Sequence, residues 1–304
     1  MIDVASSLIR QGKLVVFPTE TVYGLGANAL MDTAVAEIYA LKNRPTFNPL
    51  IAHVSSLDMA RDIVEMTPLA EKLAEAFWPG PLTMVLKRKK GVSLLATAGL
   101  DTLAVRMPNH PTALSLIEKS GVPIVAPSAN ASGTISPTTA QHVRDSFGDK
   151  TPFVLDGGGC AVGVESTILL MTTEVPVVLR YGGLAVEEIE QVIGPVARQE
   201  KDESLPRSPG QLKSHYAPNL KLRMNATEFW EGEAVLGFGK TDKATLNLSP
   251  NGDLKEAASN LFSMMHLLDD KEKYTGIAVM PIPMTGLGLA INDRLKRASA
   301  PRDV

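Results

Sequence analysis

The sequence predicts a mixed α/β protein built as two domains joined by a linker. Its 304 residues are more than one domain usually needs, and 44% of them are hydrophobic against 21% charged, the balance of a chain that folds around a core. Short apolar runs of strand length alternate with amphipathic segments of helix length. A polar, proline-containing stretch interrupts that alternation. We therefore expect an N-terminal domain over 1–198, a linker over 199–219 and a small C-terminal domain over 220–304.

The expected elements follow from periodicity and from start and stop residues. In the N-terminal domain, apolar runs predict strands at 14–17, 50–54, 83–86, 103–105, 124–126, 153–155, 167–170 and 177–179. Apolar side chains at helical spacing predict helices at 3–11, 32–42, 69–77, 111–119 and 186–193, and a further helix is expected to begin at Ser136-Pro137. In the C-terminal domain, strands at 220–224, 234–238 and 276–280 with helices at 254–268 and 287–297 predict a small parallel sheet.

Charge, cysteine content and hydropathy exclude several classes of protein. The 30 basic and 33 acidic residues give a net charge of −3, so no overall basic field attracts nucleic acid. A single cysteine, Cys160, excludes an internal disulfide, a four-cysteine zinc site and a paired-cysteine redox motif. Residues 1–13 lack the apolar run of a signal peptide, and 275–291 is too short and too interrupted by proline to span a bilayer. We expect a cytoplasmic protein without a membrane segment.

Several predicted strands end in loops that carry hydroxyl groups, glycines and single cations. The loop 17–26 places Thr19 and Thr21 beside two glycines, which suits either a ligand or a tight turn that satisfies its own backbone. Arg106 and Arg180 each follow a buried apolar run, where a cation needs a partner. That partner is either a structural carboxylate or an anionic ligand, and the sequence alone leaves both open.

Other polar residues also have both a structural and a functional interpretation. Lys42 and Arg44 follow a predicted helix, where they either complement the helix dipole or neutralise phosphates or a carboxylate. Ser128 and Asn130 follow another predicted strand. Ser136 starts a predicted helix, where its hydroxyl serves as an N-cap or the backbone N–H groups bind an anion.

The sequence contains no motif of a common catalytic or metal-binding class. The glycine-rich stretch 157–167 lacks the Gly-Lys-Ser/Thr ending of a phosphate-binding loop and the spacing of a dinucleotide fingerprint. None of the five histidines has metal-ligand spacing, so we expect no protein-built metal site, and His53 in an apolar run is more typical of a structural histidine. The residues by themselves indicate an α/β protein whose loops suit an anionic small molecule, without indicating a reaction.

Long motifs nevertheless make the chain resemble a known family. They are FPTETVYGLGANA (17–29), KNRPTFNPL (42–50), WPGPLT (78–83), LAVRMPNHP (103–111), APSANASG (126–133), GVESTI (163–168) and VLRYGG (178–183). In order and spacing they are similar to the YrdC-like domain of threonylcarbamoyl-AMP synthases, a twisted mixed-sheet α/β domain. The segments SPGQLKSHYAP (208–218) and GLGLAINDRLKRA (286–298) resemble the longer form of that family, which has a small C-terminal Rossmann-like domain.

The resemblance implies a nucleotidyltransferase that makes L-threonylcarbamoyl-adenylate from L-threonine, bicarbonate and ATP and releases pyrophosphate. The product would pass to the machinery that forms N6-threonylcarbamoyladenosine at position 37 of tRNA, and tRNA itself is not expected as a tight ligand. Mg²⁺ would arrive bound to the triphosphate rather than in a protein site. Alignment of three substrates and stabilisation of charge would supply the catalysis.

By motif position, the resemblance also implies roles for individual residues. L-Threonine would be held by Thr19, Tyr23, His53, Arg106, Ala126 and Ser166, with Arg106 facing its carboxylate. ATP would be held by Lys42, Arg44, Asn48, Thr102, Ser128, Asn130, Ser136, Arg180 and Tyr216, with the cations facing phosphates. Lys42, Arg44 and Arg106 would be the catalytic residues. Tyr216 would close the linker over the nucleotide as a lid.

Two segments depart from the pattern of the family. The family often has proline where this chain has Tyr181, and its linker commonly reads PGMKYKHYAP where this chain has Gln211 and Ser214.

A double-stranded RNA- or tRNA-binding YrdC-like module is the alternative function, with the basic run 87–90 as its contact. Another carbamoyl-transfer enzyme would need cysteine-rich finger domains, which this chain lacks.

Overall fold

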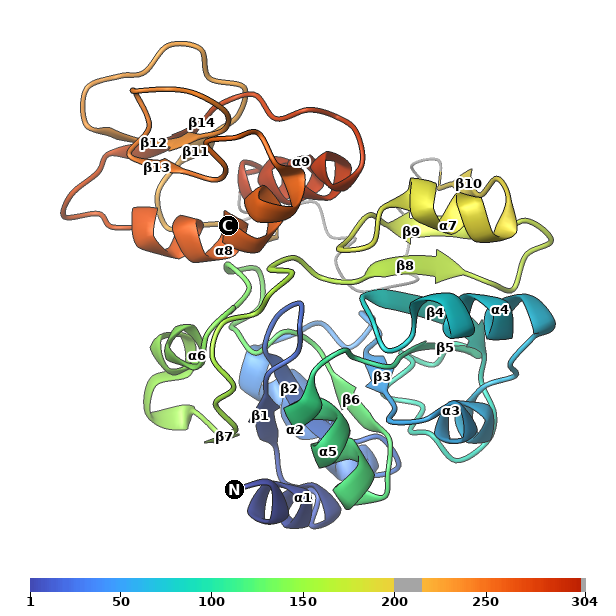
Figure 1. Ribbon diagram of the computed structural model, residues 1–304. Coiled ribbons are helices and arrows are strands. Elements are labelled where there is room, and N and C mark those ends of the chain that lie inside the picture. Colours follow the sequence, from blue (N-terminus) through green and yellow to red (C-terminus); the bar gives the residue numbers. More distant parts are fainter. Residues whose placement is uncertain (200–214, 302–304) are drawn as a thin grey trace.

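The computed structural model describes residues 1–199 and 215–301 (Figure 1). A large mixed sheet with helices on it precedes a small parallel sheet with two helices, which confirms the mixed α/β class predicted from the sequence. Most of the linker predicted over 199–219 lies outside the described residues, and so do Gln211 and Ser214. In the described ranges, no helix is both long enough and apolar enough to cross a membrane.

The large sheet joins ten strands in the order β10-β9-β8-β4-β5-β3-β6-β2-β1-β7. Its strands are β1 (Val15–Phe17), β2 (Gly24–Asn28), β3 (Ile51–His53), β4 (Leu82–Lys87), β5 (Thr102–Arg106), β6 (Ile124–Ala126), β7 (Phe153–Val154), β8 (Thr167–Leu170), β9 (Val177–Arg180) and β10 (Ala197–Arg198). The pairs β1/β7, β3/β5, β4/β8 and β9/β10 are parallel, and the other neighbours are antiparallel. The sheet is therefore mixed along its whole width.

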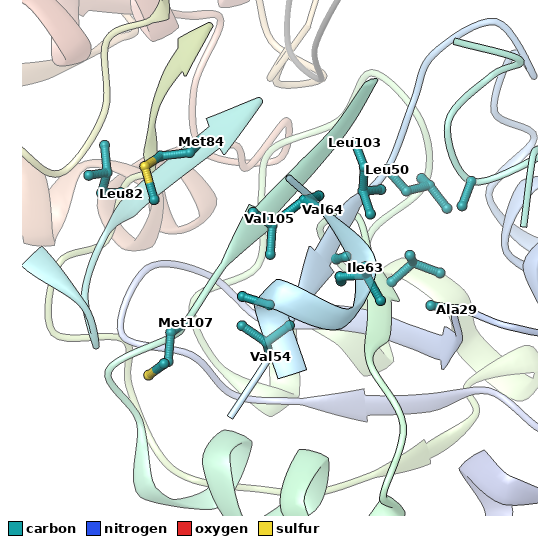
Figure 2. Packing of buried hydrophobic residues seen from close by; sticks show 14 of the residues in the cluster. Ala29, Leu50, Val54, Ile63, Val64, Leu82, Met84, Leu103, Val105 and Met107 are labelled. Carbon is teal, nitrogen blue, oxygen red and sulfur yellow. The ribbon is translucent and has the colours of Figure 1, made fainter. Parts of the chain in front are cut away.

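Alternation of side chains gives this sheet two different faces. On the first face, Val16, Val105 and Val125 belong to the main core, which α2 (Asp32–Lys42), α3 (Leu57–Ile63), α4 (Pro68–Phe77), α6 (Ala140–Phe147) and α7 (Val186–Ile193) cover. Figure 2 shows the part of this core around Ile63. On the second face, α1 (Ile2–Arg10) and α5 (Pro111–Ser120) pack together against Phe17 and its neighbours.

The middle of the second face carries a small apolar cluster that ends in polar residues. Ile51 of β3 and Ala104 of β5 are partners in register, and His53 and Arg106 are the next partners on that face. No helix of the described ranges contributes a side chain to this cluster. Thr102 begins β5 two residues before Ala104, so it shares the same face. Several of the side chains that the resemblance assigns to ligands therefore share one face of the sheet.

The C-terminal domain contains four parallel strands in the order β11-β14-β12-β13. They are β11 (Leu222–Arg223), β12 (Glu233–Gly237), β13 (Leu246–Asn247) and β14 (Gly276–Val279), with α8 (Leu254–Leu268) and α9 (Leu287–Ala298) packed against them. The same apolar cluster continues into the N-terminal domain through Val22, Ile135 and Val164. Figure 1 shows α8 between the small sheet and the N-terminal domain. The two domains thus share this apolar cluster, whereas the main core of the N-terminal domain is separate from it.

The structure differs from the predicted elements in several places, among them the two-residue strands β10 and β13 and a short 3-10 helix at Gly148–Lys150, which were not expected. Strand β2 and helix α3 were not expected, and two glycines in β2 weaken its strand pattern. Helix α6 begins at Ala140 rather than at Ser136, because the hydroxyl of Thr139 accepts from the N–H of His142 and caps the helix there. Ser136 instead lies fully buried ahead of α6.

Gly26 of β2 is predicted to be required by the close approach of its neighbours. A Cβ atom at Gly26 would lie 2.8 Å from both the Phe17 ring and a methyl group of Ile124, and both neighbours are fully buried. Gly26→Ala is expected to lower the free energy of unfolding by about 1–3 kcal/mol, the usual cost of overpacking a core. Urea denaturation followed by circular dichroism measures this change.

Gly159→Ala is the matched control for this prediction. Gly159 is exposed, and a Cβ atom there would meet nothing within 4 Å. The control variant should keep the stability of the unmodified protein. Equal stability of both variants would contradict the packing argument.

Candidate active site

A cavity lies over strands β3, β5 and β6, on the second face of the large sheet. Nine of the fifteen residues assigned by resemblance line it: Thr19, Arg44, His53, Arg106, Ala126, Ser128, Ser166, Arg180 and Tyr216. The other six, Tyr23, Lys42, Asn48, Thr102, Asn130 and Ser136, lie outside its lining. Thr21, whose hydroxyl the sequence analysis noted in the loop 17–26, also lines the cavity, and so do Glu165 and His215, to which the sequence reasoning gave no role.

Arg106, the last residue of β5, is held by three neighbours. Its Nε donates to the carbonyl oxygen of Gly80 (3.1 Å), and its Nη1 donates to the hydroxyl of Thr21 (2.9 Å). Its Nη2 forms an ion pair with Glu20 at 2.5 Å. A guanidinium carries five N–H donors, so these partners within the described chain leave donors for a ligand carboxylate. Glu20 is thus a structural carboxylate for Arg106, and an anionic ligand can still bind.

Thr19 organises the loop that follows β1. Its hydroxyl donates to the carbonyl oxygen of Val22 (2.6 Å) and accepts from the N–H groups of Thr21 and Val22, each at 3.2 Å. This is a turn closed by its own side chain, which was one interpretation of the motif. The Thr19 and Thr21 hydroxyl oxygens are 2.9 Å apart, so the turn also joins Arg106 through Thr21. The same loop therefore satisfies its backbone and lines the cavity.

Ser166 and Arg180 meet where β8 begins and β9 ends. Arg180 ends β9, and its Nε and Nη2 donate to the carbonyl oxygen (3.0 Å) and hydroxyl (3.1 Å) of Ser166. The Ser166 hydroxyl also lies 2.7 Å from that of Thr83. Burial lowers the pKa of Arg180 to about 10, but Arg180 remains charged at neutral pH. The strand-end cation is thus aligned with the serine of the GVESTI motif.

Lys42 and Arg44 are buried cations whose hydrogen bonds go to backbone carbonyls. The Nζ of Lys42 donates to the carbonyl oxygens of Ser128 (2.6 Å) and Asn130, and lies 3.5 Å from the amide oxygen of Asn130. Arg44 donates to the carbonyls of Asn48 (3.4 Å) and Pro49 (3.1 Å). Burial lowers the pKa of Lys42 well below its usual value and that of Arg44 to about 10. The pair concentrates positive charge beside the cavity.

His53 is a neutral side chain at the floor of the cavity. Its Nδ1 lies 3.1 Å from the carbonyl oxygen of Ile51, and its ring meets that of Phe17 edge to face at 5.7 Å. Burial, reinforced by the charge of Arg106, lowers the pKa of His53 to about 3. His53 is therefore uncharged at neutral pH, and its ring packs against that of Phe17.

Tyr216 and Glu165 connect the cavity to the rest of the chain. Tyr216 is 1% exposed, adopts a left-handed backbone with φ +62°, and packs 5.4 Å from the Phe262 ring of α8. A positive φ is uncommon for a bulky residue and costs about 1–3 kcal/mol, so the surroundings hold Tyr216 in place. Glu165 accepts from the Ser136 hydroxyl at 2.7 Å, which is how Ser136 approaches the cavity without lining it. The signal that could have identified Glu165 from the sequence is its position in GVESTI, just before a buried strand.

The remaining assigned residues lie around the cavity in different ways. The Tyr23 hydroxyl donates to the carbonyl oxygen of Gly158 (2.8 Å) and accepts from the N–H of Gly157 (3.0 Å), so it anchors a neighbouring loop. Asn130 donates to the carbonyl oxygen of Thr134 (2.9 Å). Thr102 lies at the far end of β5 from Arg106. Among the residues that the structure describes, no three His, Cys, Asp or Glu side chains are grouped so as to hold a metal ion.

Comparison with known proteins connects this site to a family. The family model described as "Telomere recombination" matches residues 7–182, and the model described as "Threonylcarbamoyl-AMP synthase, C-terminal domain" matches 184–300. A threonylcarbamoyl-AMP synthase of Pyrococcus abyssi is 44% identical over 99% of this chain and 94% of its own length. The chain belongs to the threonylcarbamoyl-AMP synthase family. The family that the sequence motifs resemble is thereby confirmed.

A further relative and a solved structure extend the comparison. The Bacillus subtilis threonylcarbamoyl-AMP synthase is 40% identical over 98% of this chain and 92% of its own length. The crystal structure of P. abyssi Sua5 complexed with L-threonine superimposes with a TM-score of 0.90 at 42% identity, covering 98% of this chain and 94% of that chain. The two-domain architecture of this chain is therefore that of the family.

The buried state of His53 predicts a measurable dependence of stability on pH. Because its folded pKa of about 3 lies below the unfolded value of 6.5, the unfolded state binds the proton first as the pH falls. The contribution of His53 to the free energy of unfolding is fully present above pH 6.5 and is lost as the pH falls toward 3. Between pH 7.5 and 5.0 this one group should remove about 2 kcal/mol.

His53→Gln tests this linkage. The variant should lose about 2 kcal/mol less than the unmodified protein between pH 7.5 and 5.0, as measured by urea denaturation at the two pH values. His110→Gln is the control, because His110 is less deeply buried and should give a smaller difference. Identical losses for His53→Gln and the unmodified protein would show that His53 is protonated in the folded state.

Proposed function

We propose that this protein catalyses the formation of L-threonylcarbamoyl-adenylate from L-threonine, bicarbonate and ATP, with release of pyrophosphate. The observation that carries the proposal is one cavity that gathers Thr19, His53, Arg106 and Ser166 with Arg44 and Arg180. It does so in a chain related over its full length to threonylcarbamoyl-AMP synthases. The reaction makes the protein a nucleotidyltransferase, and its product would serve the N6-threonylcarbamoyl modification of tRNA position 37 through a separate transfer machinery.

L-Threonine would bind at the end of β3 and β5. Arg106 has guanidinium donors left for the carboxylate, and Glu20 and Thr21 hold its plane in one orientation. His53 is neutral beside it, so it can donate or accept one hydrogen bond without repelling the ammonium or amine of the substrate. Ser166 and Thr19 add hydroxyl groups, and Ala126 leaves room at the floor. The P. abyssi relative was crystallised with L-threonine, which supports this substrate.

ATP would bind along the same face, on the side of the buried cations. Lys42, Arg44 and Arg180 are at least nine-tenths buried, and burial lowers the pKa of each. A triphosphate would supply the negative charge that stabilises their charged forms. Asn48 is 1% exposed, and neither polar atom of its side-chain amide has a hydrogen-bond partner among the described residues. A buried amide without partners is costly, so Asn48 is suited to a polar group of the nucleotide.

The chemistry requires alignment more than a reactive side chain. The amine of L-threonine is carboxylated to a carbamate with loss of water, and a carbamate oxygen then attacks the α-phosphorus while pyrophosphate leaves. Lys42, Arg44 and Arg180 would stabilise the charge that develops on the phosphates, and Arg106 would hold the nucleophile in line. Mg²⁺ would enter on the phosphate oxygens of ATP and help the pyrophosphate to leave.

The segment that contains His215 and Tyr216 would act as a lid. Both side chains line the cavity and are buried, and their ring centroids lie 4.0 Å apart. The Tyr216 ring also packs on Phe262 of α8. A lid that excludes water protects a carbamate from hydrolysis and strengthens the electrostatic interactions inside the site. Substrates would reach the cavity when this segment lifts away from it.

The decisive experiment is a pyrophosphate-release assay with the purified protein. Release is expected only when ATP, Mg²⁺, bicarbonate and L-threonine are all present, and L-serine should substitute poorly. Release without L-threonine would assign a different acceptor to the same ATP site. No release from the folded protein, with tRNA retained on a filter at low salt, would favour the nucleic-acid-binding alternative.

Two variants should separate the two halves of the site. Arg106→Lys keeps the charge but loses the planar fork, so it should raise the Kd of L-threonine about tenfold, which is about 1.4 kcal/mol, and change that of ATP less than about twofold. Lys42→Gln should do the reverse. Isothermal titration calorimetry measures both constants, and Lys119→Met is the control because Lys119 is exposed. The opposite pattern would exchange the two assignments.

A further inference from the structure

Arg294 is a buried cation of the C-terminal domain that reaches the N-terminal domain. It belongs to α9, is 0% exposed, and is the largest side chain in the fully buried set. Its Nε donates to the Glu165 carboxylate at 3.0 Å, and its Nη1 donates to the carbonyl oxygen of Tyr181. Tyr181 directly follows Arg180. One side chain of α9 therefore contacts both the GVESTI and the VLRYGG segments.

Glu165 transmits this contact into the cavity. It lines the cavity, and its other carboxylate oxygen accepts from the Ser136 hydroxyl at 2.7 Å. Burial by itself raises the pKa of Glu165, but Arg294, Arg180 and the Ser136 hydroxyl outweigh it and hold the pKa below its usual value. Glu165 is thus an ionised group with two cations acting on it, one from each domain.

Other contacts hold the same loops against the C-terminal domain. A Cβ atom at Gly163 would lie 2.4 Å from the carbonyl oxygen of Ser259, so the loop before Glu165 touches the backbone of α8. The Nε2 of His266 in α8 donates to the carbonyl oxygen of Ser136 at 3.2 Å. The Arg294 guanidinium also lies 5.7 Å from the Tyr216 ring. Domain docking and the shape of these loops are therefore linked physically.

We propose that Arg294 is a positioning residue for ATP: from the C-terminal domain it holds Glu165 toward Ser136 and away from Arg180, so that Arg180 and Ser136 keep the geometry that the phosphates need. This gives the C-terminal domain a defined task in the reaction. The inference rests on the proposed function, since it concerns the nucleotide half of that site. Arg294 is not required to touch a substrate.

Loss of Arg294 has a specific electrostatic consequence. Glu165 would remain buried, and Arg180 would be the remaining arginine that acts on it. A buried carboxylate that has lost its partner is costly, and pairing with Arg180 would lower that cost. Pairing with Glu165 would take the Arg180 guanidinium away from a phosphate. Arg106 is held by Glu20, Thr21 and Gly80, so its contact with the carboxylate of L-threonine should be unaffected.

The test is a double-mutant cycle with steady-state kinetics of pyrophosphate release. Arg294→Met should raise the KM for ATP at least tenfold and change the KM for L-threonine less than threefold. Glu165→Gln removes the competing charge, so adding Arg294→Met to Glu165→Gln should change the KM for ATP less than threefold. The double variant removes both charges of the Arg294–Glu165 pair together, which keeps the test valid if Arg294→Met folds poorly.

Lys296→Met is the matched control, because Lys296 is an exposed cation on the same helix. It should leave both KM values unchanged. Equal increases of the two KM values in Arg294→Met, or a tenfold ATP effect that persists with Glu165→Gln, would overturn the proposal and leave Arg294 a structural residue. An unmodified protein that releases no pyrophosphate would instead contradict the proposed function, so the two failures are distinguishable.

Discussion

Burial of positive charge is the constraint on which the rest of this structure depends. Lys42, Arg44, Arg106, Arg180 and Arg294 are each at least nine-tenths buried. Such groups are costly to remove from water unless oxygens replace the solvent. Arg106 and Arg294 have the carboxylates of Glu20 and Glu165, whereas Lys42 donates to carbonyl oxygens of the loop after β6. The loops between strands are shaped by this demand, and the cavity lies where positive charge is concentrated.

Both domains contribute to the burial of these cations. The large sheet supplies a face on which His53 and Arg106 are register partners beside an apolar cluster that contains no helical side chain in the described chain. Helices α8 and α9 then cover the loops near Ser136 and Glu165, and Tyr216 packs on Phe262 within the shared core. A site that lies between a sheet and a second domain can open by movement of a short segment, and the sheet that supports the site stays intact.

The sequence predicted the elements whose patterns are strong and missed those whose patterns are weak. The apolar run 103–105 predicted β5, and the amphipathic segment 254–268 matches α8. Strand β2 was missed because Gly24 and Gly26 carry no side chain, although the Phe17 ring needs the space that they leave. Helix α6 was started too early because Ser136-Pro137 has the composition of a cap, whereas the Ser136 hydroxyl is used by Glu165. Local propensity was overridden there by a buried partner from another strand end.

The sequence by itself determined which chemical groups are present, where the strands end, and the family to which the chain belongs, because these depend on local order and spacing. Only the tertiary structure decided the partners of those groups. Glu20 meets Arg106 and Glu165 meets Arg294 across long stretches of chain, through the strand order β4-β5-β3-β6 and the docking of α9. Periodicity carries no information about such pairs, because the two partners lie far apart in the sequence. Arg294 lies among the apolar residues of α9, so the pattern could mark it as unusual, but only the packing of the two domains shows what it holds.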